Sequence, residues 1–230
     1  GMAARVRPWM DTGIRPQGRK SDKETRMNIL AINGSHRAGK GTAALLSAVL
    51  ETAGHQGATC ELIELSHLDI RFCCGCNKCL GSNRCTIHDD MDMLYDKMMH
   101  ADGIVLGSPV YFGTVSARMK NFMDRTRPLH MVDNALAGKV GGMVTCSGLP
   151  DCGCQGALAA MDHFFATHEM LVVHPRPLGP VIGDGVAATQ LARFNEAGDP
   201  EWRSIKDDQN AFKCARRLGH DMFNLIARLS

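Results

Sequence analysis

Short runs that are apolar or alternate in polarity recur along this chain, and amphipathic segments separate them. Five runs have the length and flanking residues of strands in a buried sheet: residues 27–33, 59–65, 103–107, 139–145 and 170–174. Five segments carry apolar residues at helical spacing: residues 42–53, 90–100, 116–125, 155–167 and 210–229. This alternation predicts an α/β fold of three layers, in which a five-stranded parallel sheet carries helices on both faces.

Two segments lack this pattern. Residues 1–25 are polar and contain proline and glycine, which predicts a disordered tail or an arm that wraps a partner subunit. Residues 176–209 are a long connection rich in glycine, proline and polar residues, which predicts a surface excursion or an arm or lid at a subunit contact. Because the sequence has no repeat and no second hydrophobic core, residues 26–230 are expected to form a single domain.

Composition changes this picture mainly through the cysteines. The 230 residues are 44% hydrophobic and 22% charged with a net charge of +2, so nothing indicates a nucleic-acid or membrane surface. No run of about 18 apolar residues predicts a membrane span, and the basic N-terminus lacks the apolar core of a signal peptide. The ten cysteines are therefore expected to be reduced thiols of a cytoplasmic protein.

Four of these cysteines, Cys73, Cys76, Cys79 and Cys85, form a compact Cys-x2-Cys-x2-Cys-x5-Cys run. Thiolates at two-residue gaps let a tight loop wrap one metal cluster, and a fourth thiolate slightly further on closes the shell. The usual zinc pattern is two separated pairs, so the spacing favours a cluster over zinc. A solvent-facing loop of reduced thiols is the remaining alternative.

The loop after the first strand, residues 34–42, indicates a phosphate site. Its small residues let backbone N–H groups point inward, and the start of the following helix adds a partial positive charge. Arg37 and Lys40 add further charge, and Thr42 is placed to cap the helix and bond a phosphate oxygen. The loop is also close to the P-loop of nucleotide kinases with one residue inserted before Thr42, so a kinase is an alternative from this loop alone.

The rest of the chain argues against the kinase. Such an enzyme needs an acidic residue at the end of another strand to hold Mg²⁺. The third strand is followed by Ser108 and Pro109 and the fourth by Cys146 and Ser147, and neither pair supplies a carboxylate. The arginine-rich lid expected of such kinases is not apparent either.

Residues 107–125, GSPVYFGTVSARMKNFMDR, carry a resemblance to a known family. This stretch resembles the second flavin loop of the NAD(P)H-dependent FMN reductase group of flavodoxin-like proteins, where a Ser-Pro-x-Tyr turn precedes a helix bearing Lys, Phe and Asp-Arg. The resemblance runs from about residue 27 to 175. It implies a flavodoxin-like fold, bound FMN, and transfer of electrons from NAD(P)H to a flavin, quinone or similar small acceptor.

The resemblance also implies the residues that hold the flavin, in three loops at one edge of the sheet. The expected cofactor-binding residues are Ser35, Arg37, Gly41, Thr42, Pro109, Val110, Tyr111, Phe112, Gly113, Ser147 and Gly148. Gly41 departs from the family, which commonly has Asn at this position. Because the hydride arrives at the flavin itself, no side chain is expected to act as a catalytic acid or base.

Within this group, the iron-sulfur flavoproteins carry a compact cysteine run whose spacing Cys73, Cys76, Cys79 and Cys85 match. For these four residues the resemblance implies a [4Fe-4S] cluster that exchanges electrons with ferredoxin-like partners. Other members of the group keep similar cysteines without a cluster, so both alternatives stay open at this point. A homodimer or homotetramer is expected. The sequence does not choose between NADH and NADPH, and it assigns no role to Cys152 and Cys154.

Overall fold

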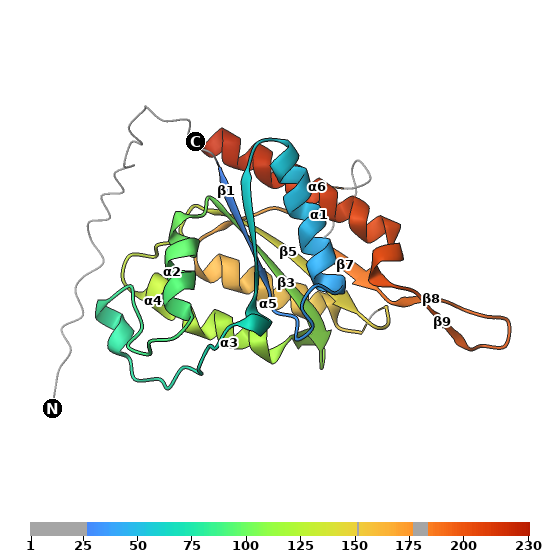
Figure 1. Cartoon of the computed structure of the whole chain (residues 1–230), viewed down its shortest axis with the longest axis horizontal. Coiled ribbons are helices and arrows are strands. Elements are labelled where there is room, and N and C mark those ends of the chain that lie inside the picture. Colours follow the sequence, from blue (N-terminus) through green and yellow to red (C-terminus); the bar gives the residue numbers. More distant parts are fainter. Residues whose placement is uncertain (1–26, 151, 177–183) are drawn as a thin grey trace.

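A computed structural model describes residues 27–150, 152–176 and 184–230, so the tail expected over residues 1–25 lies outside the described residues. A twisted parallel sheet forms the central layer (Figure 1). In spatial order its main strands are β2 (Thr59–Glu64), β1 (Asn28–Asn33), β3 (Gly103–Tyr111), β5 (Val140–Ser147) and β6 (Leu171–Val172). All neighbouring pairs along this path are parallel, which confirms the predicted five-stranded architecture.

Helices cover both faces of the sheet. On one face lie α1 (Gly41–His55) and α6 (Gln209–Leu229). On the other lie α2 (Met91–His100), α3 (Ala117–Arg125), α4 (Arg127–Met131) and α5 (Cys154–Thr167). Successive residues of β1 alternate between the two cores, since Ile29 and Ala31 face α1 and α6 while Leu30 and Ile32 face the other layer.

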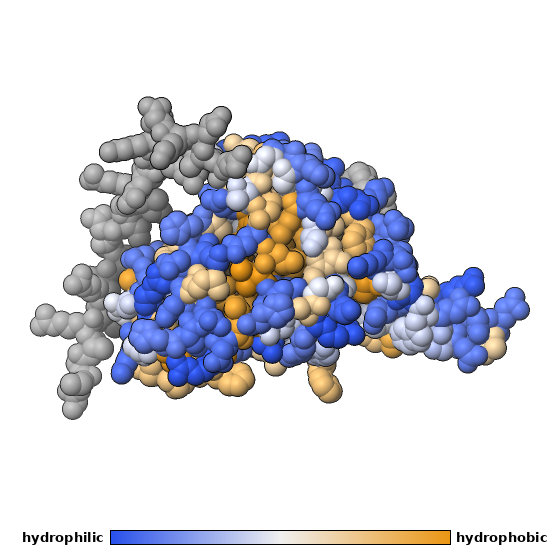
Figure 2. Space-filling model, viewed as in Figure 1, coloured by the Kyte–Doolittle hydropathy of each residue, from blue (hydrophilic) through white to orange (hydrophobic). Residues whose placement is uncertain are grey.

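Polar groups dominate the surface in the view of Figure 2, with apolar residues gathered toward its middle. Within the described residues no helix has both the length and the apolar character required to cross a membrane.

The third strand is longer than the sequence predicts. Its predicted end at Gly107 is wrong, because β3 continues through Pro109 to Tyr111 and pairs with β4 (Thr114–Val115) in an antiparallel ladder. The backbone ladder between β1 and β3 ends at Gly107, whose carbonyl oxygen accepts a hydrogen bond from Gly34 N. Pro109 therefore has no partner residue in β1 that would need its missing N–H, so it does not end the strand.

The predicted fifth strand over residues 170–174 is shorter than expected, because two segments share its position. β6 pairs with the start of β5, and β7 (Val186–Thr189) pairs with the end of β5 along the same edge. β7 belongs to residues 176–209, to which the sequence analysis assigned no helix or strand, and which we call the late connection. The same connection forms a hairpin, β8 (Leu191–Phe194) and β9 (Pro200–Trp202), that projects from the body of the molecule (Figure 1).

Close packing of α1 against α6 depends on a glycine. A Cβ atom at Gly219 would lie 2.2 Å from the carbonyl oxygen of Val49, which is a backbone atom that no rotamer change can move. We therefore expect Gly219→Ala to lower the free energy of unfolding by about 2 kcal/mol, although alanine is the better helix former by about 1 kcal/mol. Urea unfolding followed by circular dichroism measures this. Lys213→Ala, at an exposed position of the same helix, is the matched control, and a Gly219→Ala protein as stable as the wild type would contradict the packing argument.

Candidate functional site

The loops after β1, β3 and β5 surround a cavity of about 460 Å³ at the carboxyl ends of these strands. Ligands of doubly wound α/β sheets bind at this edge, and the volume falls in the range of small-molecule sites. The lining residues are Ser35, Arg37, Gly39, Lys40, Gly41 and Thr42 from the first loop, Pro109, Val110 and Tyr111 from the second, Cys146, Ser147 and Gly148 from the third, and Gln190, Ser204, Ile205 and Lys206 from the late connection. Nine of the eleven residues expected to bind the cofactor are in this set.

The first loop presents an uncapped helix start to the cavity. Lys40 is the N-cap of α1, its side chain makes no capping hydrogen bond, and the first turn contains no acidic residue. The N–H groups of Gly41 and Thr42 have no partner within the helix, since an α-helix leaves its first N–H groups unpaired. With Arg37, Lys40 and Lys206 in the same wall, this end of the cavity is suited to an anion.

A polar network below the first loop fixes its shape. Ser35 Oγ accepts a hydrogen bond from Arg37 N (3.1 Å), and Ser35 N donates to Asn33 Oδ1 (3.0 Å). The carboxylate of Glu64, at the end of β2, accepts from Asn33 Nδ2 (2.7 Å) and from Gly39 N (3.0 Å). Sequence reasoning missed Asn33 and Glu64, because their contact depends on the pairing of β1 with β2.

The late connection closes over the first loop at Gly41. A Cβ atom there would lie 2.7 Å from Cγ1 of Ile205, so glycine allows the short 3-10 helix η3 (Ile205–Asp207) to rest on the loop. This contact gives a physical reason for glycine at a position where the resemblance implies Asn. It also brings Lys206 to the cavity, which the sequence analysis did not anticipate.

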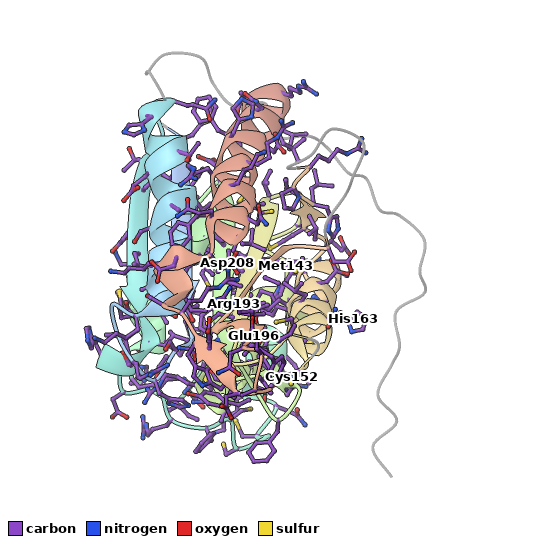
Figure 3. The ribbon with its side chains drawn as sticks, turned by 90° about the vertical axis from the view of Figure 1, so that its right-hand side faces the viewer. Met143, Cys152, His163, Arg193, Glu196 and Asp208 are labelled. Carbon is purple, nitrogen blue, oxygen red and sulfur yellow. The ribbon has the colours of Figure 1, made fainter. Side chains whose placement is uncertain are left out.

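Asp208, the residue before α6, holds the connection in place. Its carboxylate is mostly buried and accepts hydrogen bonds from Ala211 N (3.2 Å), Thr189 N (3.2 Å) and Arg203 Nη2 (2.5 Å). Figure 3 shows Asp208 where α6 begins and Arg193 and Glu196 on the hairpin. Hydrogen bonds to the Asp208 carboxylate therefore join the end of β7, on one side of the hairpin of the late connection, to the start of α6 on the other.

The second loop contributes a wall of the cavity and an exposed tip. The ring of Tyr111 lies 5.5 Å from the ring of His36, centroid to centroid. Phe112 and Gly113 are not among the residues that line the cavity. They form the turn between β3 and β4 with positive φ angles of 49° and 78°, and the Phe112 side chain is fully exposed.

Gly113 packs against the start of α5 instead. A Cβ atom at Gly153 would lie 2.4 Å from Gly113 Cα, and one at Gly156 would lie 2.1 Å from Gly113 O. Three glycines thus let the second loop and the third loop touch through their backbones.

Cys146 lies in the third loop's wall, and sequence reasoning did not select it. Its Sγ is 3.2 Å from Thr42 Oγ1, so the thiol joins the carboxyl end of β5 to the first turn of α1. Burial raises the pKa of the Cys146 thiol, which keeps it neutral. The neighbouring Ser147 Oγ accepts a hydrogen bond from Cys154 Sγ (3.3 Å), while Cys152 is exposed.

The predicted ligand cysteines lie on one irregular loop. Cys73 and Cys76 are exposed, Cys85 is partly buried, and Cys79 is buried within the short η2 helix (Lys78–Gly81). Four thiols free of disulfides fit an iron–sulfur cluster as donors. Within the described ranges, however, no three Cys, His, Asp or Glu side chains are close enough to hold one metal ion, so the loop would have to contract for these thiols to converge.

The loop that carries these thiols, residues 73–85, is called the cysteine loop, and it begins beside the cavity. A hollow of about 260 Å³ is lined by His36, Ile70, Phe72, Ala117, Arg118 and Asn121. His36 contacts the ring of Tyr111, and Phe72 immediately precedes Cys73. The residues just before the first cysteine therefore share a hollow with His36 of the first loop.

The thiols differ in their expected reactivity. A hydrogen bond from the Lys78 backbone, assisted by the Thr86 hydroxyl, lowers the pKa of Cys76, whereas burial raises that of Cys146. Since the thiolate is the reactive form, iodoacetamide at pH 8 should modify Cys76 at least about tenfold faster than Cys146. Peptide mass spectrometry over time measures both rates. In urea the two rates should become similar, and equal rates in the folded protein would contradict the assigned environments.

Comparison with known proteins finds a matching family and several relatives. The family model of NADPH-dependent FMN reductases matches residues 27–178. The chain is 35% identical over 201 residues to an iron-sulfur flavoprotein of Methanocaldococcus jannaschii, covering 87% of this chain and 97% of that protein. It is 33% identical over 192 residues to an iron-sulfur flavoprotein of Archaeoglobus fulgidus, covering 84% of this chain and 92% of that one.

Solved structures show the same fold at low sequence identity. The flavodoxin, WrbA-like protein from Agrobacterium tumefaciens superimposes with a TM-score of 0.59 at 16% identity, covering 90% of this chain and all of that protein. The kinase alternative finds no support in these relatives. The chain belongs to the NADPH-dependent FMN reductase family and is an FMN-dependent oxidoreductase.

Proposed function

We propose that FMN binds in the cavity at the carboxyl ends of β1, β3 and β5, with its phosphate on the first loop. The observation that carries this proposal is the uncapped start of α1, which faces the cavity together with Arg37, Lys40 and Lys206. A phosphate dianion would accept hydrogen bonds from the free N–H groups of the helix and would be stabilised by the cations. Ser35 and Thr42, both buried, would supply hydroxyl groups at the same place.

The flavin ring would then lie between the second and third loops. Pro109, Val110 and Tyr111 offer one wall, and Ser147 and Gly148 offer the other. When bound, FMN supplies the ring that accepts hydride and passes electrons on, and the protein supplies position and electrostatics. The exposed tip at Phe112 and Gly113 would flank the entrance rather than line the ring site.

Family membership supports NADPH as the electron donor. For the acceptor we propose a flavin, a quinone or a similar small molecule. Two relatives that match over 78 residues only, at 36% and 35% identity, are described as NAD(P)H dehydrogenase (quinone); the match covers 40% and 38% of those proteins.

A second candidate function involves the cysteine loop. We propose that Cys73, Cys76, Cys79 and Cys85 hold a [4Fe-4S] cluster that exchanges electrons with the flavin and with a ferredoxin-like protein. Relatives described as iron-sulfur flavoproteins support this proposal, as does the position of Phe72 in the hollow beside the first loop. An electron carrier of this kind would show slow oxidation of NAD(P)H and rapid reduction by ferredoxin.

We further propose a cytoplasmic homodimer or homotetramer in which the late connection contacts a partner subunit. The hairpin supports this, because it projects from the body and exposes Phe194 and Trp202 by 59% and 58%. Exposed aromatic side chains on a projecting arm are typical of contact surfaces.

Replacing Arg37 tests the phosphate site. A charge-assisted hydrogen bond contributes about 1.5 to 3 kcal/mol, so Arg37→Ala should raise the Kd for FMN at least about tenfold. Quenching of flavin fluorescence on titration measures this Kd. Arg217→Ala, on the exposed face of α6, is the control that should bind FMN as the wild type does. An unchanged Kd in Arg37→Ala would place the phosphate elsewhere.

Iron analysis tests the cluster. Protein purified without oxygen should contain about four iron and four acid-labile sulfide per FMN. Cys79→Ser should lose the iron while retaining FMN, and Cys152→Ser should keep both. Flavin without iron in the wild type would leave an FMN reductase whose cysteine loop has another role. The absence of flavin as well would contradict the whole proposal.

A further inference from the structure

One face of α3 is bonded to the chain segment that leads into the cysteine loop. Three side chains of this helix donate hydrogen bonds to main-chain carbonyl groups: Arg118 Nη1 to Leu65 O (2.9 Å), Asn121 Nδ2 to Ile70 O (2.8 Å) and Arg125 Nη1 to Arg71 O (2.5 Å). Their spacing of three and four residues places all three on the same side of the helix. The segment from the end of β2 to the first cysteine therefore lies along α3.

Arg125 also binds the chain where it leaves the cysteine loop. Its Nη1 and Nη2 donate to the two carboxylate oxygens of Asp89 at 2.6 Å and 3.0 Å, and Nη2 donates to Ile87 O at 3.3 Å. Asp89 Oδ2 in turn accepts a hydrogen bond from Arg71 N (3.0 Å). One guanidinium group thus joins the entry of the loop at Arg71 to its exit at Asp89.

This junction is buried. The side chains of Arg125 and Asp89 are 1% and 3% exposed. Burial by itself would raise the pKa of Asp89, but hydrogen bonds from Arg125 and from backbone N–H groups outweigh it and lower the pKa, so the carboxylate stays ionised. A guanidinium can serve these acceptors at once because its donors form a planar fork, which a lysine ammonium lacks.

The opposite end of α3 is bonded to the cavity. Ser116 caps the helix by accepting from Met119 N, its Oγ donates to Gly34 O (2.6 Å), and its N donates to Ser108 Oγ (2.9 Å). Gly34 directly follows β1, and Ser108 lies within β3; each of them precedes a residue that lines the cavity, Ser35 and Pro109. The nine residues of α3 therefore connect the cavity to the junction at Arg125.

We propose that α3 positions the cysteine loop relative to the flavin cavity, and that Arg125 is the positioning residue that holds the two ends of this loop together. Between the junction points the loop has one short 3-10 helix as its regular structure, so the separation of its ends limits where the thiols can lie. Fixing the ends reduces the conformational freedom that must be lost when four thiols converge on one cluster. The inference rests on the proposed FMN site and cluster.

Arg125→Lys tests this inference, because it keeps the charge and removes the fork. After anaerobic reconstitution, iron and sulfide per FMN should fall at least about fivefold, whereas the Kd for FMN should stay within about twofold of the wild type. Lys120→Ala is the matched control, since Lys120 is exposed on the same helix and should leave both quantities unchanged. Any residual cluster should show an altered electron paramagnetic resonance spectrum.

A second measurement does not require the cluster. In metal-free protein, Arg125→Lys should raise the alkylation rate of Cys79, which is 9% exposed, at least about fivefold while leaving that of Cys146 unchanged. If both rates rise, the variant has unfolded. Asn121→Ala is then used in its place, because it removes one hydrogen bond from the same face of α3, and the alkylation rates of Cys79 and Cys146 are compared in the same way.

The outcomes separate the two proposals. A wild-type protein that binds FMN but no iron would overturn the cluster, and the alkylation rates would then decide the role of Arg125 alone. Full iron content in Arg125→Lys with an unchanged Cys79 rate would overturn the positioning role.

Discussion

The parallel sheet buries apolar side chains on both of its faces, and the position of the functional loops follows from that burial. Alternate residues of β1 enter two separate cores, one under α1 and α6 and one under the remaining helices. Helices cover both faces of the sheet, and the backbone groups of the strands are used in hydrogen bonds between strands. Polar groups that could bind a ligand are therefore confined to the strand ends. The cavity accordingly forms where the loops after β1, β3 and β5 converge.

Close backbone approaches give this cavity its shape. Gly41 admits Ile205, and Gly153 and Gly156 admit the tip of the second loop at Gly113. These contacts join segments that are distant in the chain, so the wall of the cavity is assembled from both halves of the molecule. The end of the cavity that is suited to an anion combines an uncapped helix with cations from two of these segments, in a protein whose net charge is close to zero.

The cysteine loop is organised differently, because hydrogen bonds to side chains replace regular structure there. Arg125 and Asp89 close its base, and Arg127 Nη1 donates to Asn77 Oδ1 within it (2.7 Å). A loop held in this way can keep its ends fixed while its middle changes conformation. That property suits a site whose thiols are apart in the described structure and would have to converge on a cluster.

The sequence by itself determined the succession of the main strands and helices along the chain, the family and nine of the lining residues, because periodicity and loop motifs are local signals. Tertiary structure decided the features that depend on free edges and distant partners. β3 continues past Pro109 because β1 has ended beside it, and β7 fills the edge of β5 that β6 leaves open. The contacts of Ile205 and Lys206 with the cavity, and of Arg125 with both ends of the cysteine loop, join residues far apart in the chain, which no local pattern encodes.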